Sequence, residues 1–365
     1  MGAMEQAIQE LMHELQKAVR GEVLFDDITR HLYATDASDF SKMPVGVLLP
    51  KDTDDIQAAM EISGKHGVPI IPRGGGSSLS GQTVGVGLVI DLSKYLKNIL
   101  EINPEEKWVR VEPGVVLDPL NARLAQHGLM VGPDPSSSMV ATLGGMAGNN
   151  STGSHSFKYG MIADHIQEME VVLVDGSKAT FTDMDSGAIE GLALRDSLEG
   201  SLYREIPKLL DRYGEDIETG YPQTWRNVAG YRLDQMLRDQ QQGSFFNLAQ
   251  LIPASEGSLA TITQIKLGVV PRPSAINLLI LHYPKMQQAL EMVPAILEHK
   301  PAAVELMTSP SIMMADNHPA FRPILRQFIQ GNPGAILIVE FAENSQAELG
   351  HRLDTFKTWL GRQGY

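Results

Sequence analysis

The 365-residue sequence contains no cysteine. This absence excludes disulfide bridges, thiol nucleophiles, cysteine-ligated zinc and cysteine-ligated iron–sulfur clusters from within the chain. A chain without cysteine also fits a reducing compartment. We therefore predict a cytoplasmic protein, with peripheral attachment at the inner face of a membrane as the alternative location.

A long hydrophobic run and an excess of basic residues are missing as well. The sequence has no stretch of about 18 apolar residues that could cross a membrane and no secretory signal pattern. Its formal charge is −14 at pH 7, from 30 basic and 44 acidic residues. An acidic balance argues against binding to nucleic acid or to anionic lipid. We expect neither a nucleic-acid partner nor a transmembrane protein.

The length of 365 residues predicts two to three domains. Both strand and helical patterns occur along the chain, and we expect an α+β protein. Residues 45–71 read as a β-α-β unit, with Asp52 capping its helix, and Asp175-Gly176 predicts a hairpin. The expected helices are 5–20, 53–66, 117–127, 285–298 and 344–362. The expected strands are 45–49, 68–71, 88–92, 99–102, 108–112, 166–174, 178–181, 262–267, 275–282, 303–307 and 335–341.

The pattern changes after Pro271-Arg272-Pro273, and this change predicts a domain boundary. We expect an N-terminal helical segment at 1–41, a ligand-binding domain at 42–272 and a further domain at 273–365. The order strand–helix–strand, strand–helix in the last domain lacks one strand of a ferredoxin-like split β-α-β layer. The chain therefore reads as cut short within this domain.

The most informative segment follows the predicted strand at 68–71 and contains three consecutive glycines. It consists of Arg73, Gly74, Gly75, Gly76, Ser77, Ser78 and Leu79, and we call it the triple-glycine loop. Glycines permit a sharp turn and let backbone N–H groups approach a phosphate closely; an ordinary surface turn is the alternative. Gln82 stands where a P-loop needs lysine, and Leu79 where a dinucleotide fingerprint needs its third glycine, so both of those motifs fail.

Two further segments carry small polar residues next to strands. Residues 132–160 are rich in Pro, Ser, Gly and Asn without a sustained helical or strand period, which predicts an ordered functional loop. Residues 254–259, Ala-Ser-Glu-Gly-Ser-Leu, lie between two apolar runs. Uncharged donors and acceptors of this kind suit the polar edge of a flavin or its ribityl chain. Three such segments favour one extended ligand over three unrelated turns.

Four features of the sequence resemble, in their order along the chain, an FAD-binding domain of the vanillyl-alcohol oxidase (PCMH) type, which has two subdomains. They are Pro50-Lys51-Asp52-Thr53 with its helix, the triple-glycine loop, the 132–160 segment and Glu256-Gly257. The resemblance is closest to FAD-linked D-2-hydroxy-acid dehydrogenases of the D-lactate, glycolate and D-2-hydroxyglutarate group. Gly144 to Ser151 with Tyr159-Gly160 is similar to the large members that continue into an iron–sulfur region. Residues 274–365 are similar to the start of the substrate-side cap.

The resemblance implies roles for individual residues. The triple-glycine loop would wrap the FAD pyrophosphate, the 132–160 segment would line the isoalloxazine and ribityl part, and the third segment would lie near the adenosine. The residues implied beyond the triple-glycine loop are Pro133, Ser136, Ser137, Gly144, Gly145, Asn149, Gly153, Glu256, Gly257 and Ile262. Some relatives tether FAD through a histidine after the glycines, but Ser77 occupies that place here. We therefore predict non-covalent FAD.

Catalytic residues are not evident. Relatives use histidines in a Gly-Asp-Gly-Asn-x-His-like segment, often with a divalent metal, and this segment is absent from the chain. The ten histidines show no compact ligand spacing, so we expect neither a metal nor an iron–sulfur cluster here. His155 is the candidate to face the flavin, with a hydrogen-bonded loop residue as the favoured alternative. Arg73 could neutralise phosphate or be an ordinary exposed arginine, and Tyr231 in Asn227-Val228-Ala229-Gly230-Tyr231 is expected to pack.

The resemblance implies an FAD-dependent oxidation of a D-2-hydroxy acid, of the D-lactate or D-2-hydroxyglutarate class, to the 2-oxo acid. Hydride would pass to flavin N5, and the electrons would pass to a carrier or iron–sulfur region beyond this chain. Most substrate contacts would also lie beyond Tyr365. Two alternatives remain open: a flavin-binding electron-transfer subunit without its own substrate site, and an FAD oxidase or reductase for another substrate such as an alditol.

Overall fold

The computed structural model describes residues 2–243 and 246–364. The chain divides into two compact units. The first comprises the residues up to Val131, then Pro135–Ser151 and Met161–Val270; the second comprises Gly132–Asp134, Thr152–Gly160 and the chain from Pro271. Two short segments within 132–160 therefore pack with the C-terminal part of the chain. No helix in the described ranges is both long enough and apolar enough to cross a membrane.

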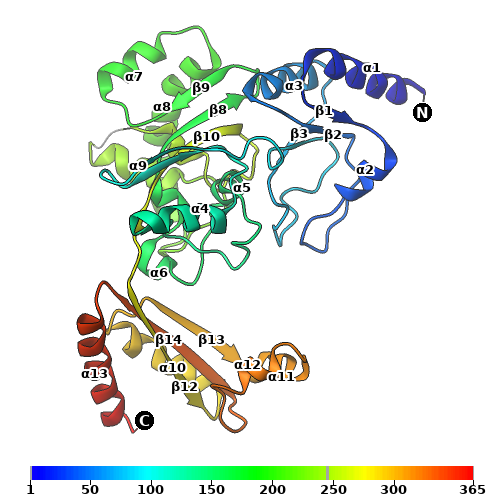
Figure 1. Ribbon diagram of the computed structural model, residues 1–365. Helices are drawn as coiled ribbons and strands as arrows, with labels where there is room; N and C mark the ends of the chain where they lie inside the picture. The colour runs from blue at the N-terminus through cyan, green and yellow to red at the C-terminus, as the bar shows by residue number, and fades with distance from the viewer. Residues whose placement is uncertain (1, 244–245, 365) are drawn as a thin grey trace. The chain divides into compact units, whose positions relative to one another are not determined.

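The first sheet of the first unit has the strand order β1-β2-β4-β3. Its strands are β1 (Glu22–Leu24), β2 (Gly46–Leu49), β3 (Ile70–Arg73) and β4 (Leu88–Asp91). β4 lies between β2 and β3 and is parallel to both, which confirms the predicted β-α-β unit. Its helix α3 (Thr53–Lys65) packs with α1 (Gly2–Ala18) on the sheet, where Leu11, Leu15 and Ile56 are fully buried (Figure 1). The short helix α2 (Asp27–Leu32) follows β1.

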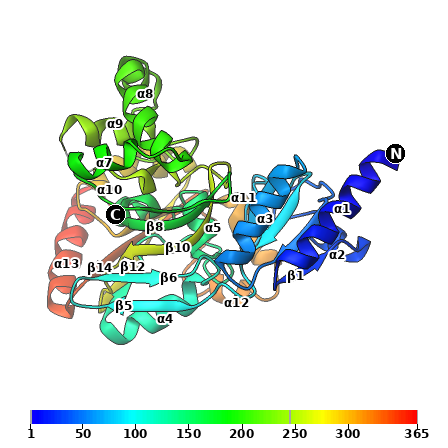
Figure 2. The ribbon, with the colours of Figure 1, turned by 90° about the horizontal axis from the view of Figure 1, so that it is seen from above.

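The second sheet of this unit is antiparallel, with the order β5-β6-β10-β8-β9. Figure 2 shows β5, β6, β10 and β8 following one another across it. The strands are β5 (Ile99–Asn103), β6 (Trp108–Val111), β8 (Ile166–Leu173), β9 (Lys178–Phe181) and β10 (Ala260–Gly268). The predicted hairpin at Asp175-Gly176 joins β8 and β9, with Gly176 at φ 84°. The largest hydrophobic core covers this sheet.

Helices that pack on the second sheet were only partly predicted. α4 (Leu117–Leu124) and the 3₁₀ turn η1 (Ala125–His127) confirm the helix expected at 117–127. Three helices were not predicted from the sequence: α7 (Ser186–Ala193), α8 (Leu198–Gly220) and α9 (Leu233–Gln241). Tyr203, Leu210 and Ile217 form a buried stripe along α8 at helical spacing. The remaining short elements are β7 (Leu129–Met130), η2 (Ile162–His165), η3 (Leu248–Leu251) and β11 (Val270–Pro271).

The 132–160 segment is not the uninterrupted loop that its composition predicted. It contains two short helices, α5 (Leu143–Gly148) and α6 (Ser156–Tyr159). Thr142 caps α5, because its hydroxyl oxygen accepts a hydrogen bond from the N–H of Gly145 at 3.3 Å. The expectation was wrong here because glycine has a low helix propensity and the helices are too short to show a period. Packing of Leu143, Met146 and Ala147, all buried, supports α5 instead.

The second unit contains a three-stranded antiparallel sheet with β14 (Ala335–Glu343) between β12 (Ala275–Tyr283) and β13 (Ala303–Thr308), as Figure 1 shows. This order agrees with the predicted split β-α-β pattern, since β12 and β13 both run antiparallel to β14. α10 (Met286–Leu297) and α13 (Gln346–Arg362) bury their apolar sides against one face. α11 (Ser309–Asn317) and α12 (Arg322–Leu325) form a smaller core with Ile336.

Replacement of Asp52 tests the capping of α3. Its carboxylate accepts hydrogen bonds from the N–H groups of Asp54 and Asp55 at 3.0 and 3.2 Å and also pairs with Arg20. Asp52→Ala should lower the free energy of unfolding in urea by about 0.5–2 kcal/mol. Asp52→Asn loses the ion pair but keeps a capping oxygen, so it should retain most of the stability. Equal losses for the two variants would contradict the capping role.

Candidate functional site

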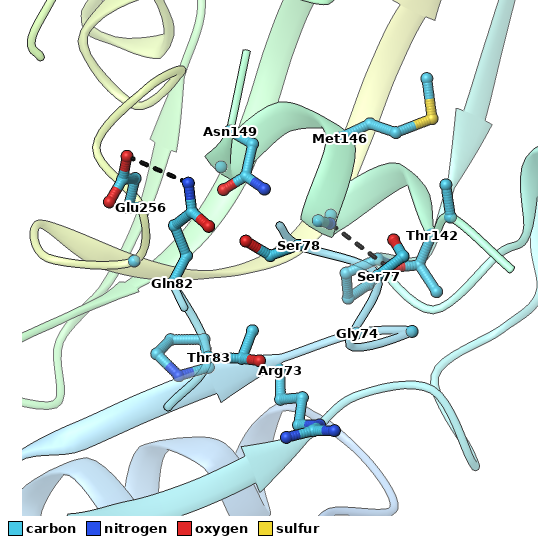
Figure 3. A pocket seen from close by; sticks show the side chains of 18 of the residues that line it. Arg73, Gly74, Ser77, Ser78, Gln82, Thr83, Thr142, Met146, Asn149 and Glu256 are labelled. Carbon is cyan, nitrogen blue, oxygen red and sulfur yellow. Dashed lines mark hydrogen bonds between the residues drawn. The ribbon is translucent and has the colours of Figure 1, made fainter. Parts of the chain in front are cut away.

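The first unit encloses a cavity of about 230 Å³ between three stretches of chain. These stretches are the end of β3 with the triple-glycine loop, the segment that forms α5, and the turn before β10 (Figure 3). Cofactor pockets commonly measure about 300–1,000 Å³, so the cavity can enclose only part of a dinucleotide. Its walls comprise residues 72–79, 82, 83, 92, 113, 137, 141, 142, 144–146, 148, 149, 151, 252, 255–257, 260 and 262.

The glycines of the triple-glycine loop are needed for contact with the neighbouring segment. A Cβ atom on Gly74 would lie 2.0 Å from the hydroxyl oxygen of Thr142, and one on Gly75 would lie 2.1 Å from the carbonyl oxygen of Val140. Both distances are far below van der Waals contact. Gly76 adopts the left-handed conformation, with φ 61°, and completes the turn. The loop can therefore reach its position only without side chains at 74 and 75.

Arg73 lines the cavity, but its charged group is bound elsewhere. The guanidinium donates a hydrogen bond to the carbonyl oxygen of Thr35 at 2.9 Å, and it lies 5.2 Å from the centre of the Tyr33 ring. Figure 3 shows it directed away from Ser78, Gln82 and Asn149. The side chain therefore joins the triple-glycine loop to the segment after α2, and this contact gives no support to a role in neutralising phosphate.

Glycines in α5 leave the opposite wall open. A Cβ atom on Gly148 would meet no atom within 4 Å, so any side chain there would project into free space beside the cavity. Gly144 serves a different purpose, because a Cβ at this position would lie 2.6 Å from the side chain of Pro113. Gly144 therefore allows α5 to pack on the segment after β6, and Gly148 leaves space in the cavity that a side chain would fill.

The turn before β10 has an unusual backbone. Ala254, Glu256 and Gly257 have φ values of 63°, 54° and 77°, and the two residues other than glycine are strained in this region. Two polar atoms of the cavity walls, Ser255 Oγ and Gln82 Oε1, are buried without a hydrogen-bond partner. Gln82 Nε2 lies 3.5 Å from Glu256 Oε1 (Figure 3). Strain and unpaired buried polar groups together are typical of ligand sites.

The cavity walls carry few charges. Among the described residues that line it, only Arg73 and Glu256 are ionisable, and no lysine contributes. Hydroxyl groups, amides and backbone N–H groups make up the polar part, including the buried hydroxyls of Ser78 and Thr142. A bound anion would therefore be stabilised by oriented dipoles rather than by cations. This donor set fits a pyrophosphate joined to uncharged rings and hydroxyls.

Fourteen of the seventeen residues predicted to bind the cofactor line this cavity: the seven of the triple-glycine loop, Ser137, Gly144, Gly145, Asn149, Glu256, Gly257 and Ile262. Pro133, Ser136 and Gly153 do not line it, and Pro133 and Gly153 belong to the second unit. Thirteen further residues line the cavity and were not predicted: Pro72, Gln82, Thr83, Leu92, Pro113, Ala141, Thr142, Met146, Gly148, Ser151, Ile252, Ser255 and Ala260. Eleven of them lie within a few positions of predicted residues, so extending each motif would have found them. Leu92 and Pro113 lie outside the three segments and carry no such signal.

His155 lies in the second unit, held between two carboxylates. Its Nδ1 is 2.5 Å from Asp134 Oδ2, and its Nε2 is 2.9 Å from Glu340 Oε1 on β14. Hydrogen bonds to Asp134 and then Glu340 raise the pKa of His155 to about 10, against the opposing effect of burial. The imidazole is therefore a cation at neutral pH with both nitrogens occupied. This geometry gives no support to a role as a general base.

The raised pKa of His155 predicts a pH-dependent contribution to stability. The imidazolium stabilises the folded state fully below its ordinary pKa of 6.5, and this contribution is lost as the pH rises through about 10. The thermal midpoint of the wild type should therefore exceed that of His155→Gln at pH 6, and the difference should shrink towards pH 10. His127→Gln, at an exposed histidine, serves as the control. A difference that stays constant from pH 6 to pH 10 would contradict the ion-pair account.

Two protein-family models match the chain. Residues 44–182 match an FAD binding domain, and residues 272–364 match the C-terminal domain of FAD linked oxidases. The first match covers the triple-glycine loop and α5, which form two walls of the cavity. The second match begins at the start of the C-terminal part of the second unit.

Curated relatives have consistent names. The chain is 35% identical over 344 residues to a D-2-hydroxyglutarate dehydrogenase of Pseudomonas putida, covering 92% of this chain and 34% of the relative. It is 29% identical to the Escherichia coli protein of that name, covering 96% and 35%. A Bacillus subtilis glycolate oxidase subunit GlcD is 30% identical, covering 82% and 54%. The chain thus spans about a third to a half of the length of these relatives.

Solved structures confirm the predicted α+β fold class. An alkyldihydroxyacetonephosphate synthase matches with a TM-score of 0.66 at 18% identity, over 95% of this chain and 59% of that one. A p-cresol methylhydroxylase matches with a TM-score of 0.64 at 15% identity, over 100% and 65%. At these identities the likeness establishes the fold alone. The family models and the curated relatives together identify an FAD binding domain followed by a C-terminal domain of FAD linked oxidases, and the chain is similar to proteins named D-2-hydroxyglutarate dehydrogenase.

Proposed function

We propose that the first unit binds FAD without a covalent link, in the cavity between the triple-glycine loop, α5 and the turn before β10. The observation that carries the proposal is the composition of the cavity walls: glycines, hydroxyls and amides, with almost no charge. Backbone N–H groups of residues 74–79 would donate to the pyrophosphate. Ser77 stands in this loop where some relatives have a tethering histidine, which supports the non-covalent mode.

The other walls would hold the rest of the cofactor. Ser137 and Asn149 offer donors and acceptors for the ribityl chain and the polar edge of the flavin. Ser255 Oγ and Gln82 Oε1 are buried and unpaired, so a ligand with both donors and acceptors would satisfy them. Bound flavin would supply the acceptor for a hydride. The residues of this chain would bind and orient it and keep its polar edge hydrogen-bonded.

We further propose that the whole protein oxidises a D-2-hydroxy acid to the 2-oxo acid. The names of the relatives, D-2-hydroxyglutarate dehydrogenase and glycolate oxidase subunit, support this reaction class. In this reaction the C–H bond at the substrate Cα would break, a bound flavin would supply the acceptor for the hydride, and a base would accept the hydroxyl proton. Electrons would leave the reduced flavin for a downstream carrier. We place the protein in the cytoplasm or at the inner face of a membrane.

Substitution of Gly75 tests the cofactor site. A Cβ at this position would lie 2.1 Å from Val140 O, so Gly75→Ala should displace the triple-glycine loop and raise the dissociation constant of FAD at least tenfold. Gly191→Ala is the matched control, because a Cβ at this exposed position of α7 meets no atom within 4 Å. Flavin fluorescence titration gives both constants. Equal affinity of the two variants would contradict the proposed site.

Anaerobic reduction tests the reaction class. The protein reconstituted with FAD is mixed with D- and L-2-hydroxyglutarate, D- and L-lactate, glycolate and an alditol, and the absorbance of oxidised flavin is followed. We expect bleaching by D-2-hydroxy acids or glycolate and none by L-hydroxy acids. The same panel is run on the whole protein, since this chain spans about a third of its D-2-hydroxyglutarate dehydrogenase relatives. Bleaching of the whole protein by the alditol alone would contradict the proposal.

A further inference from the structure

The segment Asn227-Val228-Ala229-Gly230-Tyr231 lies outside the cavity walls but contacts two of the segments that form them. It precedes α9 within the first unit. From the sequence, Tyr231 was expected only to pack. The hydrogen bonds of the segment in the structure point to a more specific role.

One contact joins this segment to the end of α5. Asn150 is fully buried and adopts the left-handed conformation, with φ 48°. Its side-chain amide donates to the carbonyl oxygen of Asn227 at 3.3 Å, and its side-chain oxygen accepts from the N–H of Ala163 at 3.1 Å. Asn150 directly follows Asn149, which lines the cavity. The 227–231 segment therefore supports the wall formed by α5.

A second contact joins the segment to the turn before β10. The Tyr231 hydroxyl lies 3.0 Å from Ser258 Oγ, and Ser258 Oγ donates to the carbonyl oxygen of Ser255 at 2.5 Å. These hydrogen bonds end at the turn before β10, in which Ala254, Glu256 and Gly257 have positive φ. A strained turn persists only when its surroundings hold it. The N–H of Glu256, which donates to Gly148 O at 2.9 Å, provides a second support.

Tyr231 is itself held in place by backbone contacts. Its carbonyl oxygen accepts a hydrogen bond from the Tyr221 hydroxyl at 2.6 Å and one from the N–H of Leu233 at 2.9 Å. The first contact ties it to the C-terminal end of α8, and the second ties it to the start of α9. Contacts with the ends of two helices thus fix the backbone of Tyr231, and its hydroxyl lies beside Ser258.

We propose that the 227–231 segment is a positioning element of the FAD site, with Tyr231 as its positioning residue. It acts through Asn150 on the α5 wall and through Ser258 on the strained turn. The Asn227 carbonyl oxygen makes the first of these contacts, and the Tyr231 hydroxyl makes the second. The proposal rests on the proposed binding of FAD in the cavity and names a residue outside it that tunes the affinity.

The test compares Tyr231→Phe, which removes only the hydroxyl, with Ser258→Ala, the double variant and Tyr213→Phe. Tyr213 is an exposed tyrosine of α8 whose ring lies against Arg212, and it does not line the cavity. A single hydrogen bond of ordinary strength corresponds to about a 3- to 10-fold change in equilibrium. Tyr231→Phe and Ser258→Ala should each raise the dissociation constant of FAD by about this factor. The double variant should show little further loss, because both changes break one connection.

A measurement on the protein without FAD tests the positioning role of Tyr231 independently of cofactor binding. Amide hydrogen exchange of the apo protein should be faster at residues 254–259 in Tyr231→Phe and Ser258→Ala than in wild type and Tyr213→Phe. Exchange in β12 of the second unit should not change. Unaltered exchange at 254–259 would overturn the positioning role. Faster exchange with unaltered FAD affinity would overturn the link to the cofactor, whereas a wild type that binds no FAD would overturn the proposed function alone.

Discussion

The rest of the site depends on one constraint, the close approach of Gly74 to the Thr142 side chain and of Gly75 to the Val140 carbonyl oxygen. The triple-glycine loop continues from β3 of the first sheet, and Thr142 caps α5, which packs on the second sheet. Any side chain at 74 or 75 would push these two halves of the first unit apart. Glycine at these positions therefore allows the two walls to come together, and the cavity forms between them.

A second consequence concerns how an acidic protein can bind a pyrophosphate. The chain carries a formal charge of −14, and Arg73, the cation in the cavity wall, is bound to Thr35 O. Oriented N–H groups and hydroxyls would then supply the whole favourable field. Such a site does not attract anions over a long range, and its selectivity depends on the positions of these dipoles. The strained turn at 254–257 and the unpaired atoms of Gln82 and Ser255 fit a wall built around a ligand.

Local patterns allowed much of the fold to be predicted. The β-α-β unit at 45–71 and the hairpin at Asp175-Gly176 follow from short-range signals, and the three polar segments all line one cavity. α5 was missed because glycines hide its pattern, and its stability comes from packing of Met146 and Ala147. The His155–Glu340 pair spans 185 residues, and Glu340 looks like an ordinary surface charge in the sequence. Contacts of this range have no local signature.

A structure of the chain with bound FAD tests the central claim most directly. We expect the pyrophosphate to lie within hydrogen-bonding distance of the N–H groups of residues 74–79, with no lysine or arginine side chain in contact. We also expect no covalent bond between Ser77 and the flavin. A pyrophosphate bound elsewhere on the first unit, or held by the Arg73 guanidinium after release from Thr35 O, would contradict the account.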